Sequence, residues 1–373
     1  MTRRLPLALG LVAALLLAGS AGAPAHAADD DVTWSVQPST PAGPDGRAAL
    51  SFQVSAGTVI TDWVAVTNYS AAPATFRVYA ADARTDYDTA AFTLINADAA
   101  STDLGAWTAV AGSNAVCAPE DVACIAAIGT TVTLDPGARA DVPVTITVPA
   151  DATPGDHSAG IVASLVSTAS APGGAGVSLE QRVGTRVYVR VGGALAPALS
   201  MRGLVAGYTA ANPFSGTASL DVDLANTGNT RVSAAPTATL TGPFGIPLAT
   251  VPLSGVDDIV PGGVAHVSAE LPDVPPLVLL FADVRISPTA ATGALPGDPL
   301  PAVVTGSVIA WAVPWLVLLA LFVLAALVAL AIWWRRRARA RLADDIAAYA
   351  DIVRAEERDA AARASTDAFE GTK

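Results

Sequence analysis

Cysteine, histidine and lysine are scarce in this chain of 373 residues. It has two cysteines and three histidines, and its single lysine is the last residue. With so few side chains that could surround a metal ion, we predict no metal site and no cofactor. Residues 28–306 contain ten arginines, no lysine and many more aspartates. Because nucleic acid is bound by basic surfaces, it is not an expected partner of this acidic stretch.

The common catalytic motifs are also missing. The chain has no G-x-S-x-G elbow, no H-E-x-x-H pair and no phosphate-binding P-loop. Aspartates are plentiful, so a hydrolase that acts through paired carboxylates stays open as an alternative. They are, however, scattered in turns and on strand faces, where solvation is the ordinary explanation. The sequence therefore favours a protein that is not an enzyme.

Residues 1–27 have the features of a cleavable signal peptide. Arg3 and Arg4 precede an apolar stretch at 5–17, and Ala25-His26-Ala27 has the A-x-A pattern of a cleavage site. An uncleaved signal anchor is the alternative, but the apolar stretch is too short to cross a bilayer comfortably. We therefore expect the mature chain to begin at Ala28 outside the cytoplasm.

A second apolar segment, at 308–334, has no charged residue and is long enough to cross about 30 Å of hydrocarbon as a helix. Tryptophans stand near both of its ends, where aromatic rings favour the membrane interfaces. Five arginines follow between 335 and 341, and the positive-inside rule places such a cluster in the cytoplasm. We predict a single-pass type I protein of the cell membrane, with an extracellular ectodomain and a cytoplasmic tail at 335–373.

The ectodomain is dominated by the alternation of apolar and polar residues that is typical of strands. Proline, glycine and asparagine interrupt it often, and no amphipathic helix of similar strength is present. Two clear examples are the apolar positions Val142, Val144, Ile146 and Val148, and the positions Leu220, Val222 and Leu224. Short strands with turns between them indicate antiparallel β-sandwiches.

A weak internal repeat divides the ectodomain into two parts. Each part has a strand that ends in asparagine, at Asn68 and Asn226, and a later Pro-Gly turn that leads into another strand, at Pro136 and Pro261. We predict an all-β fold of two tandem Ig-like β-sandwich domains, at 28–196 and 197–288, plus the C-terminal transmembrane helix. Residues 289–307, rich in proline, alanine and glycine, are expected to form a stalk.

The first domain is longer than the second between these shared features, which indicates an insertion of about 33 residues within 85–130. It contains Trp107, Cys117 and Cys124. Two lone cysteines in an exported segment favour a disulfide that closes a short loop. The insertion is either a functional addition to the scaffold or an extra hairpin that extends a sheet.

Several phrases of the first domain occur together in one known family. They are Asp62-Trp-Val-Ala-Val-Thr-Asn68, Tyr79-Ala-Ala-Asp82-Ala83, Gly105-Ala-Trp107, Leu134-Asp-Pro-Gly137, the stretch 148–161, and the stretch 182–190. In this order they resemble the WxL-interacting proteins of Gram-positive cell surfaces. The excess of alanine and arginine suggests an actinobacterial-like member. The resemblance implies that the first domain binds peptidoglycan and that the second binds host or partner proteins.

Two groups of side chains are candidates for ligand binding. Asp156 and His157 follow a Pro-Gly turn, where they either hydrogen-bond a polar ligand or satisfy the turn and pack at the start of a strand. Further on, Arg186, Tyr188 and Arg190 alternate with valines and share one face of a strand. Guanidinium groups bind carboxylates and aromatic rings stack on sugars, although cross-strand ion pairs would also explain this face.

The predicted function is binding of peptidoglycan or another cell-wall glycan through the first domain. The candidate residues for this role are Trp107, Asp156, His157, Arg186, Tyr188 and Arg190. The alternative is a protein-binding module that holds another surface or envelope protein near the membrane.

Overall fold

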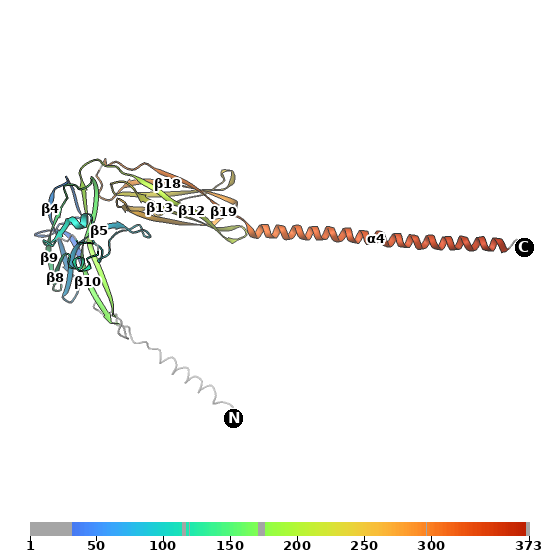
Figure 1. The fold of residues 1–373 in the computed structure, drawn as a ribbon, viewed down its shortest axis with the longest axis horizontal. Helices are drawn as coiled ribbons and strands as arrows, with labels where there is room; N and C mark the ends of the chain where they lie inside the picture. Colours follow the sequence, from blue (N-terminus) through green and yellow to red (C-terminus); the bar gives the residue numbers. More distant parts are fainter. Residues whose placement is uncertain (1–31, 114–116, 119, 171–175, 296, 371–373) are drawn as a thin grey trace, which may run out of the picture.

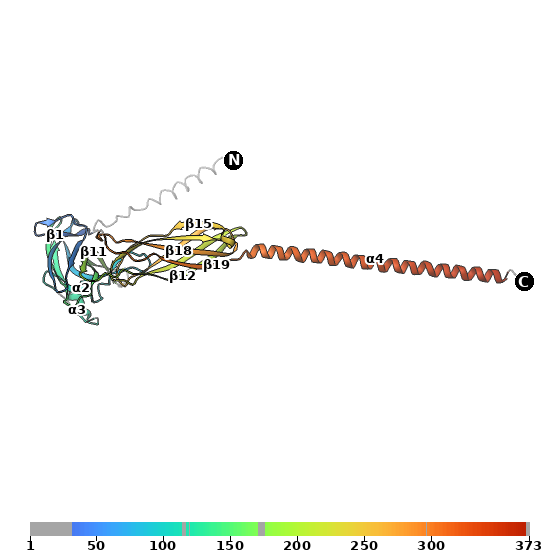
Figure 2. The same cartoon turned by 90° about the horizontal axis from the view of Figure 1, so that it is seen from above.

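The computed structural model describes residues 32–370, except 114–116, 119, 171–175 and 296. The predicted signal peptide at 1–27 lies outside the described residues. The described chain folds into two β-sandwiches that are followed by one long helix (Figure 1, Figure 2). The predicted fold class, mostly β with two sandwich domains and one apolar C-terminal helix, is confirmed.

The first sandwich packs two sheets face to face. One has the strand order β2-β1-β4-β9-β7 and the other β3-β11-β10-β5-β6, with β8 also paired to β5. The bounds are β1 Trp34–Thr40, β2 Gly43–Pro44, β3 Leu50–Val54, β4 Val59–Asn68, β5 Ala74–Thr85, β6 Phe92–Leu94, β7 Thr108–Val110, β8 Thr130–Leu134, β9 Arg139–Thr147, β10 Gly155–Ser170 and β11 Gly176–Val191. Alternate residues of these strands form the core, with Phe76, Leu50, Ile146 and Ile161 fully buried in it.

The predicted insertion crosses from one sheet of the first sandwich to the other. It contains β6, the short helix α2 (Leu104–Trp107), β7 and the short helix α3 (Val122–Ala127). Asp82 on β5 holds its middle part in place, because the buried carboxylate accepts backbone hydrogen bonds from Thr102, Asp103 and Gly105 at 2.6 to 2.9 Å. Burial raises the pKa of Asp82, and these three hydrogen bonds oppose that rise. Cys117 and Cys124 are joined by a disulfide.

The second sandwich packs a sheet of order β12-β13-β17 against a sheet of order β15-β14-β18-β19, with β16 also paired to β14. The bounds are β12 Leu199–Asn212, β13 Ser215–Asn226, β14 Val232–Thr241, β15 Pro247–Pro252, β16 Val256–Ile259, β17 Val264–Val274, β18 Val278–Ala290 and β19 Val304–Ala312, with a 3-10 turn η1 at Pro243–Gly245. Leu224, Ile259, Leu280 and Ile286 are fully buried in its core.

The internal repeat has a structural counterpart in the two sandwiches. The Asn68 side chain donates hydrogen bonds to the carbonyl oxygens of Ala72 and Leu134, and the Asn226 side chain does the same to Thr230 and Ile259. Each asparagine thereby ties the end of its strand to the segment before the Pro-Gly turn. The amide groups of Gly137 and Gly262 close the same connection, because they donate to the Asn68 and Asn226 carbonyls.

Two predicted boundaries near the membrane need correction. Residues 304–312 of the predicted stalk and transmembrane segment form strand β19, which pairs with β18. The second sandwich therefore extends past 288 to Ala312. The helix α4 spans Trp315–Glu370 and begins seven positions after the predicted start at 308, since 308–312 satisfy their backbone groups in the sheet. α4 contains an 18-residue window of mean hydropathy 3.0, which gives it the length and composition to cross a membrane.

Candidate functional site

The alternation on β11 places its side chains as the sequence predicts. Val187, Val189 and Val191 are buried in the core of the first sandwich. Arg186, Tyr188 and Arg190 point to the other face, which is the face that meets the second sandwich. The candidate residues of this strand therefore belong to the junction between the two domains.

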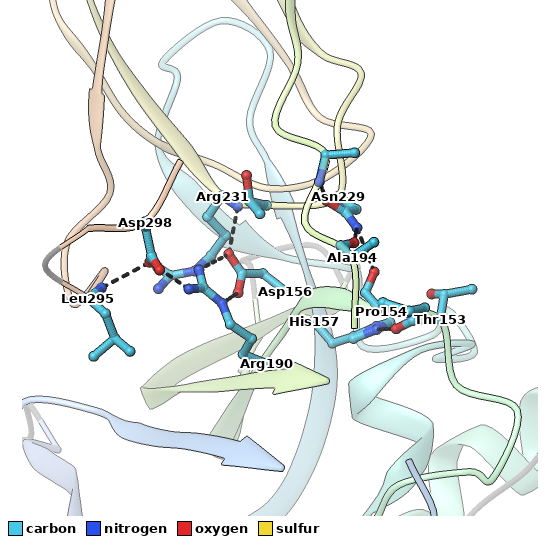
Figure 3. A network of polar contacts seen from close by, with 12 residues as sticks. Thr153, Pro154, Asp156, His157, Arg190, Ala194, Asn229, Arg231, Leu295 and Asp298 are labelled. Atoms are coloured by element: carbon cyan, nitrogen blue, oxygen red, sulfur yellow. Dashed lines mark hydrogen bonds and ion pairs between the residues drawn. The ribbon is translucent and has the colours of Figure 1, made fainter. Parts of the chain in front are cut away.

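Arg190 is the centre of one ion-pair cluster in this junction (Figure 3). Its guanidinium group donates two hydrogen bonds to Asp156, at 2.6 and 2.9 Å, and a third to Asp298, at 2.5 Å. Asp156 comes from β10, and Asp298 comes from the connection between β18 and β19. The hydrogen bonds with Asp156 raise the pKa of Arg190 further above its usual range, so the arginine is charged at every physiological pH.

A second cluster surrounds Tyr188, whose hydroxyl donates a 2.6 Å hydrogen bond to the Asp258 carboxylate. Arg231 donates to the other oxygen of Asp258 at 2.7 Å, and its guanidinium carbon lies 3.6 Å from the centre of the Tyr188 ring. Burial, together with the hydrogen bond to Asp258, raises the pKa of Tyr188 to about 12. The hydroxyl therefore stays protonated and acts as a donor.

The Pro-Gly turn before β10 joins the same junction. The Asp156 amide donates to the carbonyl oxygen of Asn229, and the Asp156 carboxylate accepts from the Arg231 amide at 2.8 Å. Gly155 has a φ of +127°, and a Cβ at this position would collide with the Asn229 carbonyl group. The turn is thus shaped to let the backbones of the two domains touch.

His157 points away from the junction, toward the insertion. Its Nδ1 lies 2.6 Å from an oxygen of Asp103, its Nε2 lies 2.9 Å from the Thr153 carbonyl oxygen, and its ring packs on Trp107 with the ring centres 4.5 Å apart. Burial by itself lowers the pKa of His157, but the contacts with Asp103 and Thr153 outweigh it, so the pKa is raised. His157 and Trp107 thereby connect β10 to the insertion.

Arg186 differs from its neighbours because its side chain is 49% exposed. It lies over the Phe92 ring, 4.8 Å from the ring centre, and is 4.0 Å from Asp258. It lines a groove of about 280 Å³ with Phe92, Leu94, Gly160, Arg182 and Thr185. Of the six candidate residues, Arg186 is the one whose charged group faces solvent in an open groove.

The sequence did not reveal the partners that occupy the predicted binding face. Arg231, Asp258 and Asp298 all belong to the second domain and lie far from β11 in the sequence. None of them is part of a recognisable motif. The one local signal of an ion-pair cluster is that an acidic turn residue, Asp156, precedes an arginine-rich strand in an acidic protein.

Comparison with known proteins gives no family membership. No family model matches this chain, and no curated protein matches it. Similar solved structures include a chaperone–tip adhesin complex of CFA/I fimbriae, with 10% identity, a TM-score of 0.32 and coverage of 74% of this chain and 98% of that chain. Others are the class 5 fimbriae chaperone CfaA, with 11% identity, a TM-score of 0.31 and the same coverage, and the Pseudomonas aeruginosa chaperone CupB2, with 12% identity, a TM-score of 0.28 and coverage of 72% and 99%.

These findings contradict the predicted resemblance to WxL-interacting proteins. Neither the family models nor the curated proteins give a match to that family, and the similar solved structures named above are fimbrial chaperones. The predicted binding of peptidoglycan was inferred from that resemblance and is therefore also wrong. The structure also gives a physical reason: Tyr188 and Arg190, which were to meet carboxylates and sugars, are engaged by aspartates of the second domain.

Proposed function

We propose that this protein is a membrane-anchored protein-binding module without catalytic activity, and that its partner adds a strand to a projecting hairpin. The hairpin consists of β10 and β11, and its outer part, residues 165–170 and 176–182, is called the arm below. The arm extends away from the body of the first sandwich (Figure 1).

The backbone edges of the arm support this proposal. β5 pairs with β10 only over 159–164, and β3 pairs with β11 only over 187–191. In the described part of the chain, β10 beyond Ser164 and β11 over 180–186 therefore have a neighbouring strand on one side only. Open edges of this kind offer N–H and C=O groups in register for a strand of another protein.

The side chains near the arm provide an apolar surface for such a strand. Val166 is 59% exposed, Leu179 is 54% exposed and Val183 is 37% exposed. Leu165, Leu179 and Val183 lie on the face that continues from the buried Ile161 and Ala163. The arm thus extends the inner face of the sandwich beyond the opposite sheet, and a partner segment would bury it.

The groove beside Arg186 adds polar contacts at the base of the arm. It combines the exposed guanidinium groups of Arg182 and Arg186 with the apolar side chains of Phe92 and Leu94. A partner with an acidic residue next to its paired strand fits this groove, because a guanidinium group binds a carboxylate through two hydrogen bonds. In this proposal Asp156, Tyr188 and Arg190 keep the two domains in place and do not touch the partner.

Helix α4 anchors the protein, with the arginines after Trp334 on the cytoplasmic side and the sandwiches outside. Both described histidines are hydrogen-bonded to aspartates, His157 to Asp103 and His266 to Asp223, which supports structural roles. One of the similar fimbrial chaperones is known in complex with a tip adhesin, so it too binds another protein, but our proposal for this chain rests on its own arm.

Site-specific photo-crosslinking in cells tests the proposal. A photoreactive residue at Leu179 or Val183, which share one face of β11, should give an adduct of one defined mass, whereas the same residue at Val205 on β12, which is 57% exposed, should give none. The Leu179→Ser, Val183→Ser double variant should then lower the affinity for the captured protein at least tenfold, because each buried apolar side chain contributes about 1.5 kcal/mol or more. Val205→Ser is the matched control. Equal adducts at Val205, or wild-type affinity of the folded double variant, would contradict the proposal.

A further inference from the structure

The end of the second sandwich next to α4 is made by four chain segments. Three are turns, at 211–215 between β12 and β13, at 242–247 between β14 and β15, and at 275–278 between β17 and β18. The fourth, at 311–315, leads from β19 into α4. The strand registers place them at the same end, since Gly216 pairs with Val274, Thr241 with Phe281, and Val278 with Ala312.

Large apolar side chains project from all four segments. Phe214 is 79% exposed, and Phe244 is fully exposed at 103%. Trp311 and Trp315 are 70% and 73% exposed, and the smaller contributors are Ile246 at 48% and Val278 at 46%. Single exposed apolar residues are normal on a protein surface, but a set of this size at one end of a domain marks an interaction surface.

Charge is absent from these segments. None of the residues at 211–215, 242–247, 275–278 and 311–315 is acidic or basic. The nearest acidic group in the chain is that of Asp273, which accepts a 3.5 Å hydrogen bond from Ser215 and is exposed. A surface without basic residues has no electrostatic attraction for anionic lipids or for acidic proteins.

We propose that this end of the second sandwich, called the membrane-facing end below, rests in the interfacial layer of the lipid bilayer. The surface is continuous with the apolar part of α4, which begins at Trp315, and the turns lie beside the first turn of that helix (Figure 1). Tryptophan and phenylalanine side chains at such a depth meet both acyl chains and headgroups. The helix that crosses the membrane thereby brings Phe214 and Phe244 to its surface.

The backbone of the turns is shaped to present these side chains. Phe244 has a φ of +61° and Val278 a φ of +74°, in the left-handed region that residues other than glycine rarely adopt. Such strained conformations persist only where the surrounding structure holds them. Here they direct apolar side chains away from the sandwich and toward the level at which α4 enters the bilayer.

The consequence is a second contact between the protein and the membrane, which is independent of partner binding. It would hold the second sandwich upright on the bilayer and the first sandwich, with its arm, at a fixed distance above the bilayer. Because the contact is apolar, it should depend little on salt or on anionic lipid.

Fluorescence quenching in vesicles tests this inference with the full chain. An environment-sensitive dye on Phe244→Cys or Phe214→Cys reports the membrane-facing end, and the same dye on Ser254→Cys reports an exposed position at the opposite end of the same domain. Each protein is reconstituted into phosphatidylcholine vesicles with and without lipids that carry a quencher at the level of the glycerol backbone. We expect at least threefold stronger quenching at positions 214 and 244 than at 254, unchanged in 0.5 M NaCl.

Three results would overturn the inference. Quenching at Phe244→Cys no stronger than at Ser254→Cys would show that the membrane-facing end stays in water. A blue shift of the dye without quenching by lipid would show that protein covers this end. Quenching that disappears in high salt would show that the contact is electrostatic. None of these measurements involves the arm, so they are independent of the proposed function.

Discussion

Arg186 and Arg190 show how two arginines on one strand face can have different roles. They are four residues apart on the same face of β11, with Tyr188 between them, yet the Arg190 side chain is 15% exposed and the Arg186 side chain is 49% exposed. Arg190 neutralises the buried carboxylate of Asp156, whereas Arg186 borders an open groove. A buried ion pair becomes costly when one partner is removed, because the other charge is left without compensation.

We therefore predict that Arg190→Gln lowers the free energy of unfolding by about 3 to 5 kcal/mol. Arg186→Gln, four residues away, should lower it by less than about 1 kcal/mol because the side chain is largely solvated. Urea unfolding followed by tryptophan fluorescence measures both variants. A similar small loss for both would show that the Arg190 pairs contribute little to the junction.

The His157 contact with Asp103 predicts a dependence of stability on pH. The folded state raises the pKa of His157. A raised pKa contributes stability that is fully present below the unfolded value of about 6.5 and is lost as the pH rises through the folded pKa. The stability difference between the wild type and His157→Gln should thus be larger at pH 5.5 than at pH 8.5. His266 is present in both proteins, so its own titration cancels.

Asp103→Asn is the control for this prediction. It keeps the shape of the residue that faces His157 Nδ1 but removes the charge. In this background the pH dependence of the His157→Gln effect should shrink, while the packing of His157 on Trp107 is retained. An unchanged pH dependence would assign the pKa shift to groups other than Asp103.

At the scale of elements, the disulfide in the insertion gives a prediction about its bonding and its contribution to stability. Alkylation of the native protein should leave its mass unchanged until Cys117 and Cys124 are reduced. The Cys117→Ser, Cys124→Ser double variant should lose only about 2 to 3 kcal/mol, because the loop that it opens is short. Labelling of thiols in the unreduced protein would contradict the bonded pair.

Local sequence patterns predicted most strands correctly, but the prediction failed where an element or a contact depends on residues far away in the sequence. Alternation identified the strands around Val144, Val187 and Val222, since each has one face in a core. β19 was missed because its alternating residues run directly into the apolar segment of α4 and were counted with it. The faces of β11 were also predicted correctly. The residues that cover the outer face of β11 were not predicted. Nothing in the local sequence around Asp258 and Asp298 indicates that they contact Tyr188 and Arg190.

At the scale of the whole molecule, the contacts between the two sandwiches in the described part of the chain include two separate regions. One is the ion-pair junction around Arg190. The other is formed by the end of β5 and the loop that follows it: the Tyr87 carbonyl oxygen accepts from the His266 amide, and the Thr85 hydroxyl oxygen accepts from the Val260 amide. Two separated contacts restrain bending between the domains, which fixes the arm relative to α4.

The orientation of the chain in the membrane gives a prediction at the same scale. External protease added to cells without their wall should digest the sandwiches and leave an epitope placed after Lys373 intact. The physical reason is the arginine cluster that follows Trp334. Permeabilised cells are the control, in which the epitope should be lost. Loss of the epitope without permeabilisation would reverse the orientation.

The central claim is that a partner strand pairs with the arm, and amide hydrogen exchange measures this pairing directly. With the crosslinked partner purified and added back, the amides at 180–186 that point away from β10 should exchange at least tenfold more slowly than in the protein alone, because added strand pairing protects them. Amides of β12, a long strand at the edge of a sheet in the second sandwich, should be unaffected. Unchanged exchange of these amides at 180–186, or protection confined to β12, would contradict the account.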